Sequence, residues 1–189
     1  MKKFRVMTSV FALLAMSTIV QAEPKVATVV EGLSVPCGVA IQPGTGHVFV
    51  ADSAAGRVVR IVDGKIENVI VDFPIDKYGK GPTYPIGPLG LAFIDEKVLA
   101  VGGGGYPDAK DKLRVYNIPA TGGDALNADE DDAAALEIPA TDKLAGEGNF
   151  YGVAFTGDAL FVTCNGAVSY THLRAHETSL HLVCRLLLE

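Results

Sequence analysis

The end of the chain holds the residue types that most readily bind a metal. Five candidate ligands lie close together there: His172, His176, Glu177, His181 and Cys184. On a helix, residues four apart share one face, and histidines at that spacing can bind zinc. A metalloprotease places its Glu directly after the first His or directly before the second. Leu173 and Ala175 occupy those positions, so we predict no metal site.

An origin in sequencing-adapter DNA explains this end of the chain better than metal binding does. "VSYTHLRAHET", residues 168–178, resembles the translation of a transposase-type sequencing adapter. "HLVCRLLLE", residues 181–189, resembles the primer segment that follows such an adapter, and the gap between them has the size of an index. The alternation of polar and apolar residues also stops at residue 168. We therefore interpret residues 167–189 as a non-native tail. Codons unrelated to the adapter at 168–178 would contradict this interpretation.

Two loops nearer the middle of the chain are candidates for binding a ligand. They are "PIDKYGKGPTYPIGP", residues 74–88, and "VGGGGYPDAKDK", residues 101–112. The second lacks the helix and the Gly-Lys-Ser/Thr ending of a phosphate loop. Aromatic loops on a rigid scaffold can bind ligands, and glycines let backbone approach a ligand closely, although such loops are more often plain connections. The candidate ligand contacts are Tyr78, Tyr84, Gly103, Gly104 and Tyr106.

An acidic stretch follows, "NADEDD" at residues 127–132. A calcium loop that began at Asn127 would need Gly at position six and Glu at position twelve, where Asp132 and Ile138 stand. We therefore expect a solvated loop whose acids lie at the N-terminus of a short helix, "DDAAALE", where negative charge is favoured. No cofactor is evident from the sequence.

The N-terminus predicts export. A basic start is followed by an apolar run and a small-x-small ending at Ala22, which is typical of a bacterial-type signal peptide over residues 1–22. The run is shorter than the roughly 20 apolar residues of a membrane span. After cleavage, 13 Lys and Arg remain against 22 Asp and Glu, a formal charge of −9 that disfavours nucleic acid and anionic lipid. We expect a periplasmic or secreted protein that has no membrane contact after signal removal and binds an unknown small molecule or protein.

Export permits a disulfide. Cys37 and Cys164 lie two repeats apart, however, so we expect both to be free, with a Cys37–Cys164 bridge as the alternative.

Between signal and tail the chain repeats itself. A Gly-apolar-Ala-apolar run, a short turn and a second apolar run recur with glycines at Gly38, Gly90 and Gly152, at periods of 52 and 62 residues. Each unit predicts several short strands, and Asp63-Gly64 between two strand-like runs predicts a hairpin. The longer second period indicates an insertion at 119–149, with the fourth strand of that unit near Leu136–Ile138.

Repeats of this length predict propeller blades. "PCGVAIQPGTGHVFVADSAAGRVVRI" resembles the NHL-type and TolB-like six-bladed β-propellers. The resemblance implies an all-β fold of four-stranded blades over residues 23–166, incomplete at about two and a half blades. The blades are expected at about 37–73, 89–139 and, truncated, 150–166. In closed propellers a leading strand commonly completes the last blade, which would be the role of "KVATVVEGL", residues 25–33.

The family includes binding platforms and enzymes, so the fold does not choose between them. Lactonase relatives place an acidic metal ligand on the first strand of the first blade. Here the corresponding runs "CGVAI", "GLAFI" and "GVAFT" carry no carboxylate, and Glu147 and Asn149 lie just before the third. We therefore expect a binding or interaction module rather than an enzyme. The alternative is a lactonase-like hydrolase with a metal in its channel, and catalytic residues stay unknown.

Overall fold

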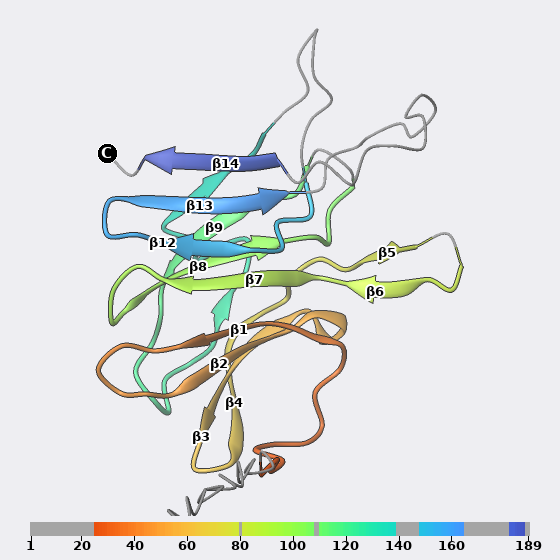
Figure 1. Cartoon of the computed structure of the whole chain (residues 1–189). Helices are drawn as coiled ribbons and strands as arrows, with labels where there is room; N and C mark the ends of the chain where they lie inside the picture. The colour runs from red at the N-terminus through yellow and green to blue at the C-terminus, as the bar shows by residue number, and fades with distance from the viewer. Residues whose placement is uncertain (1–24, 80, 108–109, 139–147, 165–181, 188–189) are drawn as a thin grey trace, which may run out of the picture.

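The computed structural model describes residues 25–79, 81–107, 110–138, 148–164 and 182–187. These residues form an all-β structure (Figure 1), as the sequence predicted. Helical structure among them is limited to a single 3-10 turn, η1 (Ser53–Ala55). The predicted signal peptide and the histidine-bearing part of the tail, including the residues that begin the proposed adapter translation, lie outside the described residues.

The first sheet is an antiparallel meander at the predicted position. It consists of β1 (Pro36–Ile41), β2 (Val48–Asp52), β3 (Arg57–Val62) and β4 (Lys65–Val71). Asp63 and Gly64 join the last two strands with φ of 49° and 73°. Positive φ at both central residues is what a type I′ hairpin turn requires, so the Asp-Gly signal is confirmed.

The second sheet repeats this order. It consists of β7 (Pro88–Phe93), β8 (Val98–Gly103), β9 (Leu113–Asn117) and β11 (Ala134–Leu136), which pairs with β9. The fourth strand thus begins two residues before the predicted Leu136–Ile138. The short helix expected over "DDAAALE" is wrong, because its alanines pair with the open edge of β9, and tertiary pairing overrides helix propensity.

The third sheet is shorter. β12 (Val153–Phe155) pairs with β13 (Ala159–Cys164), and β13 pairs with β14 (Leu182–Leu187). β14 belongs to the stretch that the sequence predicted to be a non-native tail. An unpaired strand edge offers a row of hydrogen-bonding groups to any extended segment. Without β14, β13 would present such an edge, so the pairing of β14 does not require a native strand at this position.

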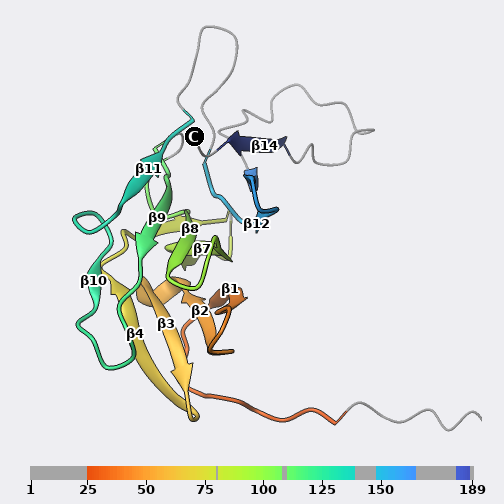
Figure 2. The same cartoon turned by 90° about the vertical axis from the view of Figure 1, so that its left-hand side faces the viewer.

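The predicted insertion links the first two sheets along their outer edges. Its strand β10 (Leu126–Asn127) pairs in parallel with β4, and β11 then pairs with β9. Figure 2 shows β10 beside β4 and β11 beside β9. The connection is anchored inside the molecule: Ala128 is buried, and its carbonyl accepts a hydrogen bond of 2.7 Å from Tyr116 Oη.

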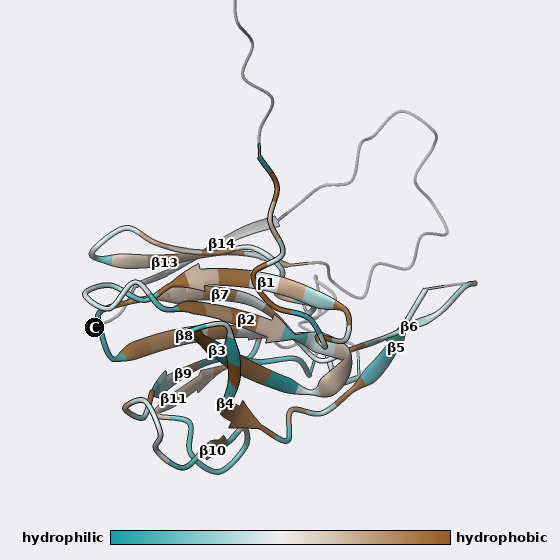
Figure 3. Ribbon diagram, turned by 90° about the horizontal axis from the view of Figure 1, so that it is seen from below, coloured by the Kyte–Doolittle hydropathy of each residue, from teal (hydrophilic) through white to brown (hydrophobic). Residues whose placement is uncertain are grey.

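The three sheets stack, and apolar side chains fill the space between them. The core between the first two includes Phe49, Val58, Leu91 and Leu99, all buried. A second core, which includes Phe150 and Leu160, lies between the second and third sheets. Figure 3 shows hydrophobic colour on the stacked strands and hydrophilic colour toward β5.

The first strands of the sheets, β1, β7 and β12, lie side by side in both Figure 1 and Figure 2. Glycine permits the close approach. A Cβ at Gly38 would lie 2.1 Å from the Leu89 carbonyl oxygen, and one at Gly90 would lie 2.4 Å from the Tyr151 carbonyl oxygen. The repeated glycine therefore marks the contact between neighbouring first strands.

The leading segment is not a strand, contrary to expectation. Residues 25–33 pair with no other strand of the described structure, and Val26 and Val29 are 91% and 67% exposed. Val30 and Leu33 pack instead on the outer face of the first sheet, against a cluster that includes Val59. A strand requires a partner strand, and the described residues provide none at this position.

Candidate functional site

One end of the stacked sheets collects most of the predicted ligand contacts. We call it the hairpin face: the starts of β1, β7 and β12, the loop segments 104–107, 110–112 and 148–152, and the hairpin of β5 (Asp76–Tyr78) and β6 (Tyr84–Ile86). The hairpin projects away from the sheets (Figure 1).

Tyr78 and Tyr84 face each other across this hairpin. They are directly paired in its register, and the two residues are 39% and 47% exposed. Tyrosine joins an apolar ring to a hydroxyl, a combination suited to contact surfaces. The structure therefore pairs the two tyrosines that the sequence analysis selected in this loop.

A third exposed tyrosine was missed by the sequence analysis. Tyr151 precedes β12 and is 42% exposed. The pKa of its hydroxyl is raised, mainly because the hydroxyl is partly buried. The charges of Tyr78, Cys37 and Asp111 raise it further by smaller amounts. Each of these three groups therefore acts on Tyr151 from the same end of the sheets. The position before the repeated glycine could have revealed it, because Cys37 and Leu89 hold that position in the other repeats.

Tyr106, in contrast, is held inside a polar cluster. Its Oη donates to the Asp129 carboxylate at 2.6 Å, and Arg114 donates to Oη at 3.0 Å and forms an ion pair with Asp129. The Arg114 guanidinium also lies 5.2 Å from the centre of the tyrosine ring. Burial, followed by the hydrogen bond to Asp129, raises the pKa of Tyr106. Its side chain thus joins the glycine-rich loop to the acidic insertion.

Gly103 and Gly104 are buried in the packing between sheets. The Gly103 N–H donates to the Lys112 carbonyl and its own carbonyl accepts from the Phe150 N–H, both at 2.9 Å. A Cβ at Gly104 would lie 2.4 Å from the Leu89 side chain. Close packing explains these glycines without a ligand.

A buried carboxylate organises the loops beneath the tyrosines. Asp111 is 1% exposed and accepts from the N–H groups of Tyr106 and Asn149, both at 2.9 Å. Asn149 has a φ of 50°, and its buried Oδ1 has no hydrogen-bond partner in the described structure. The sequence analysis did not select Asp111, because a single acid in a loop carries no pattern.

The described cysteines do not form a disulfide. Cys37 is exposed on β1 and Cys164 is buried on β13. Within the described ranges, no group of three or more His, Cys, Asp or Glu could hold a metal ion. His172 and His176 lie outside those ranges.

None of the described helical structure is long and apolar enough to cross a membrane. Comparisons with protein-family models and with curated proteins find no match to this chain. Function must therefore be argued from the site itself.

Proposed function

We propose that the three sheets are successive blades of an NHL-type or TolB-like β-propeller, of which the chain carries about two and a half. Support comes from the strand order shared by the first two sheets and from the adjacent first strands. The glycine contact is also repeated. Gly38 packs against Leu89, the residue before Gly90, and Gly90 packs against Tyr151, the residue before Gly152. A constant relation between neighbouring units is typical of repeat architectures.

The function that the hairpin face supports best is that of an exported binding or interaction module. The observation that supports this function most strongly is that three half-exposed tyrosines, Tyr78, Tyr84 and Tyr151, lie on one face. Tyrosine is enriched at protein interfaces, and the loops of a rigid scaffold are common binding elements. The partner is a protein segment or a small molecule that the rings can cover. Export rests on the signal-like residues 1–22.

A peptide-display experiment tests this proposal. The whole chain is panned against a random peptide library, and the affinity of selected peptides is measured on the chain and on the triple variant Tyr78→Ser, Tyr84→Ser, Tyr151→Ser. Loss of the three rings should weaken binding at least tenfold, because aromatic anchors dominate interface energies. The matched control is Val29→Ser, Val39→Ser, Ile41→Ser, which removes three exposed apolar side chains elsewhere and should leave affinity within twofold.

Two results would overturn the proposal. Selected peptides that bind the tyrosine variant as tightly as the parent chain would place the binding surface elsewhere. Hydrolysis of an aliphatic lactone that depends on an added divalent cation would favour the lactonase-like alternative.

A further inference from the structure

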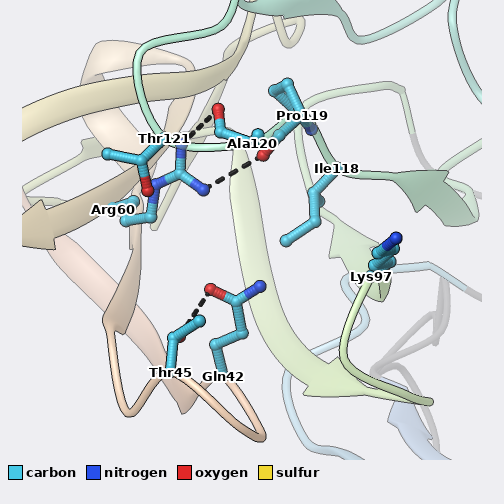
Figure 4. Close-up of a pocket in the computed structure, with 8 residues that line it drawn as sticks. All are labelled: Gln42, Thr45, Arg60, Lys97, Ile118, Pro119, Ala120 and Thr121. Carbon is cyan, nitrogen blue, oxygen red and sulfur yellow. Dashed lines mark hydrogen bonds between the residues drawn. The ribbon is translucent and has the colours of Figure 1, made fainter.

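A pocket of about 370 Å³ lies at the opposite end of the sheets, between the first and second. The turn after β1, strand β3, the turn before β8 and the segment after β9 enclose it (Figure 4). Its lining residues are Gln42, Thr45, Arg60, Lys97, Ile118, Pro119, Ala120 and Thr121. This volume falls within the roughly 300–1,000 Å³ of small-molecule sites.

Several hydrogen-bond acceptors around this pocket are occupied by the protein itself. Arg60 donates to the carbonyls of Pro119 and Ala120 at 3.0 and 2.9 Å. Gln42 Oε1 accepts from the Thr45 hydroxyl at 2.9 Å, and Gln42 Nε2 donates to the Glu96 carbonyl at 2.7 Å. A ligand that donated hydrogen bonds to these oxygens would compete with donors of the protein itself.

Hydrogen-bond donors, in contrast, remain available at this pocket. Gln42 is 8% exposed, and one of the two N–H groups on its Nε2 donates to the Glu96 carbonyl, which leaves the other as a surplus donor. Lys97 forms no ion pair with any carboxylate of the described residues. A buried donor without a partner calls for an explanation, and a ligand oxygen supplies one.

The geometry points to a binding site for a small organic carboxylate, and we propose this as a second site, separate from the hairpin face. The ligand is negatively charged because the pocket offers an ammonium and surplus N–H donors. It is organic because Ile118 and Pro119 give the pocket an apolar wall. Its carboxylate contacts Lys97 and Gln42, and its short apolar part lies against that wall.

Butyrate is the probe for the test. Its binding to the whole chain is measured by ligand-observed nuclear magnetic resonance, beside butyramide and inorganic phosphate. Lys97→Met should weaken butyrate binding at least fivefold, and Gln42→Leu at least threefold. Lys77→Met, which removes the same charge from the exposed hairpin at the other end, should change it less than twofold. Arg60 stays unchanged, since its loss would break the buried ion pair with Glu67.

The outcomes separate the alternatives. Butyrate binding with no measurable butyramide binding supports the need for an anion. Phosphate that bound as tightly as butyrate would overturn the organic assignment. Butyrate binding unaffected by either pocket variant, or equally weakened by Lys77→Met, would overturn the site. A folded chain that bound no butyrate would do the same, and the amide proton spectrum of each variant shows whether it is folded.

Discussion

At the residue scale, two buried arginines connect the sheets to the insertion. Arg60 on β3 and Arg114 on β9 are each 1% exposed. Arg60 donates to the carbonyls of residues 119 and 120, and Arg114 forms an ion pair with Asp129. A buried charge is costly unless it is paired and hydrogen-bonded, so each arginine fixes the segment that satisfies it.

Glu67 completes the Arg60 cluster, so Glu67→Gln should destabilise the chain. The Glu67 carboxylate accepts from Arg60 Nη2 at 2.6 Å and from the Gly122 N–H at 2.8 Å. We expect a loss of about 1.5–3 kcal/mol in the free energy of unfolding at pH 7, the range for a hydrogen bond to a charged group. Urea unfolding measures it. Glu31→Gln, at an exposed position, is the control and should change stability by less than about 0.5 kcal/mol.

The same pair gives a pH dependence. The hydrogen bond from Arg60 lowers the pKa of Glu67 below its usual 4.5, despite an opposing effect of burial. A carboxyl with a depressed folded-state pKa stabilises the fold above its unfolded pKa and loses that contribution as the pH falls through the folded value. The stability difference between the parent and Glu67→Gln should therefore shrink only below about pH 4.5. A difference that stayed constant down to pH 3 would contradict the ion pair.

At the element scale, the contact between β1 and β7 depends on the repeated glycine. Gly38→Ala would place a methyl group 2.1 Å from the Leu89 carbonyl oxygen, so backbone must move. We expect a loss of about 2–3 kcal/mol, the upper part of the range for overpacking. The control is Gly123→Ala in a surface turn, where the nearest atom would be 3.0 Å away, and it should cost less than about 1 kcal/mol. The free energy of unfolding of both variants is measured by thermal or urea unfolding. Equal losses for Gly38→Ala and Gly123→Ala would contradict this role of the glycine.

The sequence predicted those elements whose signal is local. Strands β1–β4 follow from alternating apolar residues and the turn at Asp63-Gly64, and β7–β9 follow from the same pattern. The path of the insertion was not predictable, because β10 and β11 are two and three residues long and exist only through their partners. Tyr151 and Asp111 were missed for a related reason: their importance comes from neighbours distant in sequence.

At the scale of the whole molecule, the first sheet has one face packed and the other partly open. Its inner face contributes to the core shared with the second sheet, and its outer face is covered in part by Val30 and Leu33. Val39 and Ile41, on the same side of β1, remain 62% and 66% exposed. In the proposed propeller, a neighbouring blade would cover this face. Apolar side chains beside an open strand edge favour self-association.

Replacing that apolar pair should therefore make the chain more soluble without weakening it. Val39→Thr with Ile41→Thr keeps β-branched residues on the strand, so the free energy of unfolding should stay within about 1 kcal/mol. The concentration at which association begins should rise severalfold, as measured by sedimentation velocity and light scattering. Val26→Thr with Val29→Thr, which are at least as exposed but lie off the sheet, should raise it much less. A parent chain that stayed monomeric at the same concentrations as the β1 variant would show that this face needs no cover, which would count against its role as a contact between blades.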